Sequence, residues 1–181
     1  GRKVFARYAD LLKRLATFPK PTVARVKGFC LAGGMGFMLA CDIVITSDDS
    51  WFGTPEVNVG LWPMMIGALI FRNVPRKKAM EMILLADRIK AADAHAMGLI
   101  TRVVPAAGLD GAVGDVLKSL AARSPIGIKI GKEAFQAAEG MDLEDCLLYT
   151  SDAADDLLCV DRGGRRIIKK KKNKQHTNTQ T

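Results

Sequence analysis

Residues that commonly bind metal ions are scarce in this sequence. Its only histidines are His95 and His176, and none of its cysteines forms a C-x-x-C pair or lies at zinc-site spacing from a histidine. The four cysteines are Cys30, Cys41, Cys146 and Cys159. Structural zinc sites need such spacings, so this pattern favours a reduced, intracellular protein with buried thiols. His95 lies among alanines, where we expect a partly buried structural histidine.

Long apolar runs and a signal-like start are also missing. No apolar run reaches the roughly 18 residues that a membrane span requires. The first residues lack the charged-then-apolar pattern of a secretory signal. We therefore expect no membrane partner and no secretion. Because residue 1 is Gly1 and not methionine, we also expect the start of the natural chain to be missing.

Acidic residues are absent after Asp161, where the basic residues gather. The eight basic residues there equal the formal net charge of the whole chain, +8. They are Arg162, Arg165, Arg166, Lys169, Lys170, Lys171, Lys172 and Lys174. A basic signal for nucleic acid or an anionic surface thus belongs to a tail, and the rest of the chain is neutral.

The remaining sequence has the composition and alternation of one α/β domain. With 181 residues and 49% hydrophobic content, the chain can bury a core. Apolar spacing, prolines and glycines predict helices at 4–18, 33–40, 64–71, 76–86, 91–97, 109–122 and 125–138. Strands are expected from Thr22, at 42–46 and at 99–104. Alternating strands and helices favour helices packed against a sheet.

A glycine-rich turn follows the first strand. Val23, Ala24, Val26 and Phe29 alternate as in a half-buried strand, and the next helix opens with three glycines, Gly33, Gly34 and Gly36. Glycine lets a ligand approach the backbone, and the first N–H groups of a helix have no partner within it. The turn is therefore a candidate oxyanion hole. A dinucleotide site is a weaker interpretation, because Leu39 stands where the third glycine would be.

A single carboxylate, Glu56, stands in an apolar segment that runs to Pro63. Apolar surroundings make a carboxyl group easier to protonate, which suits proton transfer. The alternative is an ordinary solvated loop glutamate. Trp62, Pro63, Met64 and Met65 are equally compatible with an acyl pocket and with plain core.

Three stretches resemble the crotonase superfamily, the enoyl-CoA hydratases and isomerases. They are VKGFCLAGGMGFMLACDIVI, FGTPEVNVGLWP and RKKAMEMILLADRIKAADAHAMGLITRVVP. The resemblance implies an α/β fold, a crotonase-like β-β-α spiral with C-terminal helices that pack trimers together. It runs from about residue 5 to 145, and the family's front segment is absent, so we expect 1–145 to be a partial acyl-CoA domain.

The resemblance also implies roles for individual residues. Gly33 matches the residue whose N–H binds the thioester oxygen, and Glu56 matches a catalytic glutamate. Both are otherwise explained by structure alone, Gly33 as a tight turn and Glu56 as a loop acid. Substrate contacts are expected from Ala32, Gly34, Gly36, Pro55, Val59, Trp62, Pro63 and Met64. No metal or redox cofactor is implied, and coenzyme A enters as part of the substrate.

Gly36 departs from the hydratase pattern. Hydratases of this family carry a second glutamate at this position, and two carboxylates suit the addition of water. One carboxylate suffices to move a proton between C2 and C4 of a 3-enoyl thioester while oxyanion donors stabilise the enolate. The sequence therefore favours 3-enoyl to 2-enoyl-CoA isomerisation. Enoyl-CoA hydration of the fatty acid β-oxidation type, or acyl-CoA binding without catalysis, are the alternatives.

The end of the chain departs from the family as well. We interpret 146–181 as a non-family tail, disordered or artefactual, such as translated adaptor sequence. A genuine basic tail that binds polyanions remains an alternative. For the intact protein the resemblance implies a homotrimer or a dimer of trimers, and no nucleic acid partner. It also implies the cytoplasm of a bacterium or the mitochondrion of a eukaryote.

Overall fold

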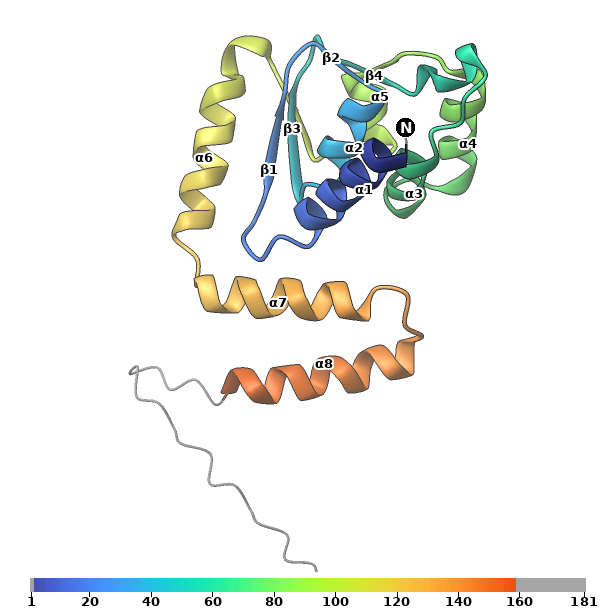
Figure 1. Ribbon diagram of the computed structural model, residues 1–181. Helices are drawn as coiled ribbons and strands as arrows, with labels where there is room; N and C mark the ends of the chain where they lie inside the picture. Colours follow the sequence, from blue (N-terminus) through green and yellow to red (C-terminus); the bar gives the residue numbers. More distant parts are fainter. Residues whose placement is uncertain (1, 159–181) are drawn as a thin grey trace, which may run out of the picture. The chain divides into compact units, whose positions relative to one another are not determined.

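Helices and short strands alternate along residues 2–158, the part of the chain that the computed structural model describes (Figure 1). These residues fall into two units, one ending at Glu133 and the other beginning at Ala134. This boundary lies inside α7 (Pro125–Ala138), a helix with no buried residue. The division expected between residues 145 and 146 does not coincide with this boundary between units, and it stays a prediction.

The first unit contains two small sheets. The first has the order β1-β3-β6 and is parallel; its strands are Val23–Val26, Ile43–Ser47 and Arg102–Val104. The second has the order β2-β4-β5, with strands Phe29–Leu31, Trp51–Gly53 and Ile89–Lys90. β2 and β4 run parallel, and β5 is antiparallel to β4.

The run from Thr22 to Phe29 forms two strands where one was expected. Lys27 and Gly28 separate β1 from β2, and Gly28 has a positive φ of 77°, a conformation that glycine adopts without strain. The chain thereby passes from one sheet to the other, and β3 and β4 repeat the passage. Two consecutive strands followed by a helix are the expected β-β-α unit of the spiral, which the structure confirms.

The helices of the first unit follow the sequence pattern closely. They are α1 (Arg2–Ala16), α2 (Gly33–Leu39), α3 (Met64–Asn73), α4 (Arg76–Leu85), α5 (Ala91–Ala96) and α6 (Leu109–Ala121). Two short 3-10 helices, η1 (Pro55–Val59) and η2 (Ala106–Gly108), complete the unit. Pro75 separates α3 from α4, and Gly98, with a φ of 86°, follows α5, as the sequence predicts. His95 is exposed, contrary to the expected partial burial, because it lies on the solvent side of α5.

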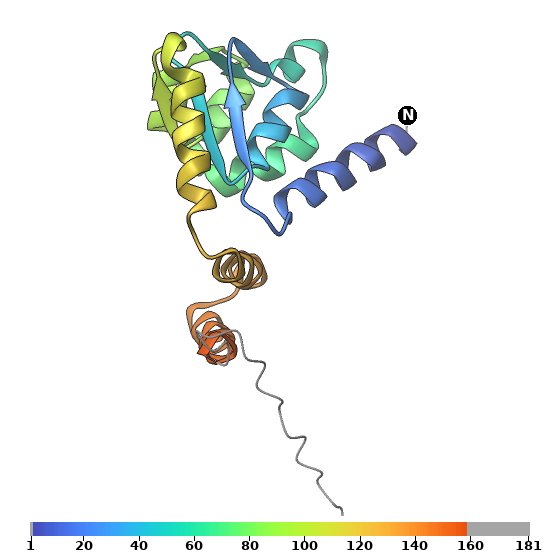
Figure 2. The ribbon, with the colours of Figure 1, turned by 90° about the vertical axis from the view of Figure 1, so that its left-hand side faces the viewer.

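The β1-β3-β6 sheet has a core on each face. Alternate residues of β3 point to opposite faces, so Val44 packs into a large cluster with Phe52 and Ile70, while Ile45 packs with Leu109 of α6. Figures 1 and 2 show α6 on one side of this sheet and α2 on the other. The large cluster holds the strand-to-helix junctions in place.

In the second unit, helix α8 (Leu143–Leu158) includes the first part of the expected tail. Residues 146–158, for which disorder or an artefactual origin was expected, are helical in the structure. Asp142 accepts a hydrogen bond from the Asp145 N–H at 3.0 Å, and Glu144 and Asp145 lie in the first turn, where acids are favourable. The sequence D-L-E-D is thus a helix start that the resemblance to the family obscured. Residues 159–181 lie outside the described part of the chain.

None of the helices within residues 2–158 is both long and apolar enough to cross a bilayer.

Candidate active site

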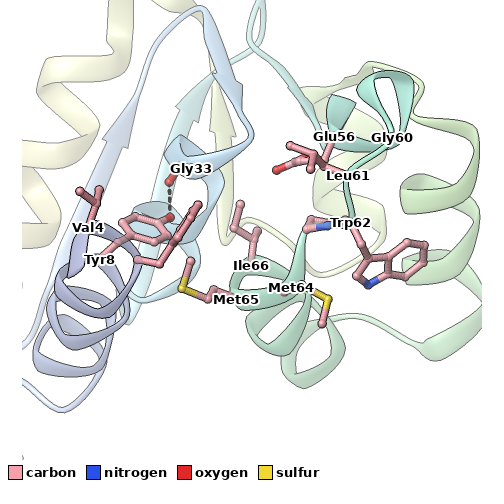
Figure 3. Close-up of a pocket in the computed structure, with 12 residues that line it drawn as sticks. Val4, Tyr8, Gly33, Glu56, Gly60, Leu61, Trp62, Met64, Met65 and Ile66 are labelled. Atoms are coloured by element: carbon pink, nitrogen blue, oxygen red, sulfur yellow. Dashed lines mark hydrogen bonds between the residues drawn. The ribbon is translucent and has the colours of Figure 1, made fainter. Parts of the chain in front are cut away.

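The first unit contains an apolar pocket of about 800 Å³, a size typical of small-molecule sites (Figure 3). Its walls come from α1, from the start of α2, and from the segment between η1 and α3. The lining residues are Val4, Phe5, Tyr8, Gly33, Glu56, Gly60, Leu61, Trp62, Pro63, Met64, Met65 and Ile66. Glu56 and Tyr8 supply side-chain oxygens to a wall that is otherwise largely hydrocarbon.

Strand pairing brings Gly33 and Glu56 to the same pocket. β2 and β4 are parallel neighbours, with Leu31 opposite Gly53. Gly33 follows the end of β2, and Glu56 follows the end of β4. Since parallel strands end at the same edge of a sheet, two segments that are distant in the sequence meet there.

Gly33 presents its backbone to the cavity. It is the first residue of α2, so its N–H has no partner within the helix. A Cβ added at Gly33 would find its nearest heavy atom, the Tyr8 hydroxyl oxygen, at 3.6 Å, an ordinary contact. There is therefore open space beside the Gly33 backbone, which a ligand oxygen can occupy.

Ala32 precedes this turn in a strained conformation. Its φ is 48° and its ψ is −126°, a region that glycine adopts readily and alanine does not. Its N–H donates to the Gly53 carbonyl oxygen at 3.0 Å, which ties the turn to β4. Strain of this kind costs about 1–3 kcal/mol and gathers at functional sites. Here the strained turn, tied to β4, holds the peptide group that carries the Gly33 N–H.

Glu56 has one carboxylate oxygen that is buried without a partner. The side chain is half-buried, and Oε2 makes no hydrogen bond to any described residue. Leaving a buried polar atom unpaired costs about 1–3 kcal/mol. Figure 3 shows Glu56 extending from η1 toward the side of the pocket where Gly33 and Tyr8 lie. A carboxylate in this setting is suited to exchange a proton with a bound ligand.

Tyr8 contributes a hydroxyl group from α1. It donates a hydrogen bond to the Gly33 carbonyl oxygen at 2.8 Å. Its ring meets Phe37 edge to face, with centroids 5.4 Å apart and an interplanar angle of 87°. Burial raises the pKa of the Tyr8 hydroxyl, and the charges of Glu56 and Cys30 raise it further. Tyr8 is therefore a neutral phenol at neutral pH.

Gly36 lies against Tyr8, a residue of the pocket lining, and is not itself part of that lining. A Cβ added there would collide with the Tyr8 hydroxyl oxygen and would lie 3.3 Å from both methyl carbons of Leu12. Any side chain at residue 36 therefore requires Tyr8 to move. The space that a glutamate side chain at residue 36 would need is therefore already occupied by Tyr8 of α1.

A family model described as Enoyl-CoA hydratase/isomerase matches residues 3–158. The chain belongs to the enoyl-CoA hydratase/isomerase family. The match includes α8, so it continues beyond the limit of 145 inferred from the sequence.

Similar proteins agree with this family. Enoyl-CoA hydratase domain-containing protein 3, mitochondrial, of Xenopus laevis is 34% identical over 173 residues, 94% of this chain and 59% of its own length. Short-chain-enoyl-CoA hydratase of Clostridium acetobutylicum is 32% identical over 154 residues, 84% of this chain and 59% of its own. The crystal structure of human enoyl-CoA hydratase domain-containing protein 3 superposes with a TM-score of 0.85 at 34% identity, covering 90% of this chain and 64% of that one. The chain thus spans about three fifths of these family members.

Some residues expected to contact substrate in this family member line the pocket. Trp62, Pro63 and Met64 do so, together with Gly33 and Glu56. The other expected contacts do not belong to the lining, and they are Ala32, Gly34, Gly36, Pro55 and Val59.

These five residues occupy the turns around the pocket. Ala32 and Pro55 immediately precede the two key residues, and Gly34 lines a separate, smaller cleft beside Cys30. The Val59 side chain is 74% exposed.

Tyr8 is a polar pocket residue that sequence reasoning missed. The sequence placed it only within the helix expected at 4–18. Its hydroxyl group was the available signal, because a tyrosine on a buried face needs a hydrogen-bond partner. The partner, Gly33, lies in another element, and the sequence alone does not show their proximity.

Asp42 has a structural role at the start of β3. It accepts hydrogen bonds from the N–H and hydroxyl of Thr22, at 2.7 and 2.8 Å, and pairs with Lys132 at 2.5 Å. These contacts hold the start of β3. Among residues 2–158, no cluster of three or more His, Cys, Asp or Glu side chains is placed to hold a metal ion.

Proposed function

We propose that this chain carries the acid/base centre of an acyl-CoA enzyme, with Glu56 as the proton carrier and the Gly33 N–H as one oxyanion donor. One observation carries the proposal. Glu56, which has one buried carboxylate oxygen without a hydrogen-bond partner, lines an apolar pocket together with Gly33. The apolar walls suit an acyl chain, and the glycine leaves room for a thioester oxygen.

The favoured reaction is conversion of a 3-enoyl to a 2-enoyl thioester. Glu56 takes a proton from C2, and the electron pair of that C–H bond enters the thioester system as an enolate. The charge on the thioester oxygen is stabilised by peptide N–H donors such as that of Gly33. The same carboxyl group then returns the proton to C4, and the double bond moves to C2–C3. Atoms and charge balance without a second acid.

Hydration of a 2-enoyl thioester is the second candidate. It is favoured by the name of a relative, the short-chain-enoyl-CoA hydratase of Clostridium acetobutylicum. Hydration requires a water to be held and deprotonated while a proton reaches the neighbouring carbon, a task suited to two carboxylates. Residue 36 is glycine in this chain, and Tyr8 closes the space beside it. The single carboxylate therefore supports isomerisation over hydration.

The proposal extends to partners and location. The substrate is an acyl-CoA thioester, and no metal or redox cofactor is needed, because peptide N–H groups meet the enolate charge. We propose a homotrimer or a dimer of trimers for the complete protein, in the bacterial cytoplasm or, for a eukaryotic source, the mitochondrion. Relatives named as mitochondrial support the second location.

The decisive experiment is Glu56→Gln in the complete protein. Glutamine keeps the shape of the side chain and removes the proton carrier, so isomerisation of 3-hexenoyl-CoA should fall by about 10²- to 10⁴-fold. The dissociation constant for the substrate should change little, because the apolar walls are untouched. Isothermal titration and absorbance at the enoyl thioester band measure the two quantities.

Glu81→Gln is the matched control. Glu81 is an exposed glutamate on α4, paired with Lys78 at 2.8 Å, and it is not one of the residues that line the pocket. Its replacement should leave turnover unchanged. Normal turnover by Glu56→Gln would contradict the proposal. Substrate binding without turnover by the wild-type protein would favour an acyl-CoA-binding homologue that lacks catalysis.

A further inference from the structure

Tyr8 is fixed in place by contacts with two residues of α2. Its hydroxyl donates to the Gly33 carbonyl oxygen at 2.8 Å, and its ring packs edge to face on Phe37. Both partners lie on the helix that forms one wall of the pocket. Any change that moves the ring therefore breaks contacts with both ends of the first turn of α2.

The fixed hydroxyl closes the space beside Gly36. A Cβ at residue 36 would overlap the Tyr8 oxygen, and the Leu12 methyl carbons at 3.3 Å close the other side. Neighbouring glycines differ, because a Cβ at Gly33 meets Tyr8 only at 3.6 Å and one at Gly34 meets the Cys30 sulfur at 3.8 Å. The exclusion is therefore specific to residue 36.

We propose that Tyr8 is a specificity-determining residue, whose neutral phenol occupies the place of a second carboxylate and so favours double-bond isomerisation over the addition of water. This inference rests on the function proposed above. The phenol uses its proton in the bond to Gly33, so it holds the first turn of α2 and does not serve as the base for a water. Glu56 then remains the single proton carrier at the reacting carbons.

The steric part is tested by a double-mutant cycle that needs no activity. Gly36→Ala in the wild-type background should lower the melting temperature by about 5 °C, because it overpacks the contact with Tyr8. In a Tyr8→Phe background, which lacks the colliding oxygen, the same change should cost little. Gly34→Ala is the control and should have the same effect in both backgrounds. Additive losses for the residue 36 pair would overturn the inference.

The chemical part is tested with the variant Tyr8→Ala/Gly36→Glu in the complete protein. Hydration of 2-hexenoyl-CoA and isomerisation of 3-hexenoyl-CoA are measured side by side. The ratio of hydration to isomerisation should rise at least about 10-fold above wild type, in line with the worth of an added acid/base group. A general loss of stability would lower both rates and leave the ratio unmoved.

The outcomes separate the two proposals. An unchanged ratio in a folded double variant overturns the role of Tyr8, while loss of activity in Glu56→Gln still supports the proposed function. Rapid hydration by the wild-type protein also overturns the role of Tyr8. If the wild-type protein converts neither substrate, the proposed function fails, and the role of Tyr8 in specificity fails with it.

Discussion

Gly33 contributes to the pocket through its backbone, so the absence of a side chain is its functional property. Replacing it with valine should fill the space in front of its N–H while disturbing little of the protein, because a Cβ there makes only ordinary contacts. Loss of one oxyanion donor costs roughly 3–4 kcal/mol of transition-state stabilisation. We therefore expect Gly33→Val to lower turnover by about 10²- to 10³-fold and to change the melting temperature little.

A matched control for this prediction is Gly111→Val. Gly111 lies on α6, where nothing stands within 4 Å of an added Cβ, and it is not one of the residues that line the pocket. The control should keep full turnover, and circular dichroism melts report the folding of both variants. Near-normal turnover by a folded Gly33→Val protein would show that another donor holds the thioester oxygen.

At the scale of elements, the helices as far as α7 and the strands β1, β3 and β6 could be predicted, whereas β2, β4, β5 and α8 could not. Pro75 and Pro125 mark helix starts, and α7 begins and ends where the sequence predicts. β4 has three residues and β5 has two, too few to display an alternating pattern. Short strands of this kind are specified by their neighbours in the sheet.

The candidate site was likewise predictable only in part. Gly33 and Glu56 stand out locally, as a glycine turn and as a lone acid. Their meeting depends on the pairing of β2 with β4, and the closure of residue 36 depends on Tyr8, which lies on another helix. The strain at Ala32 is likewise set by tertiary contacts, because alanine by itself does not favour a positive φ.

Helix α8 begins with a side-chain cap. The Asp142 carboxylate accepts the Asp145 N–H at 3.0 Å and so caps the helix. Asp142→Ala should destabilise α8 by about 1 kcal/mol, the usual worth of such a cap. Amide hydrogen exchange across 143–150 should accelerate, while exchange in β3 stays unchanged. Asp142→Asn, which retains an acceptor oxygen, should exchange like wild type, and equal exchange in all three proteins would contradict the capping role.

For the whole molecule, the unequal distribution of charge is the main feature. The eight basic residues beyond Asp161 account for the entire net charge, and a chain that ends at Asp161 carries none. The pocket and both hydrophobic clusters lie within residues 4–116. Binding to polyanions and binding of an acyl thioester are therefore expected to depend on different parts of the sequence.

Deletion of the basic segment tests this separation. Deleting residues 162–181 should leave the melting temperature and the Glu56-dependent turnover of the complete protein unchanged. Affinity for a polyanion such as heparin at low salt should fall, since each lost basic contact removes a share of the counterion release that drives such binding. Retention on heparin and enoyl-CoA turnover, measured on the same preparations, test both halves. A fall in melting temperature on deletion would mean that the basic segment supports the fold, and turnover lost with the segment would tie it to the acyl-CoA site.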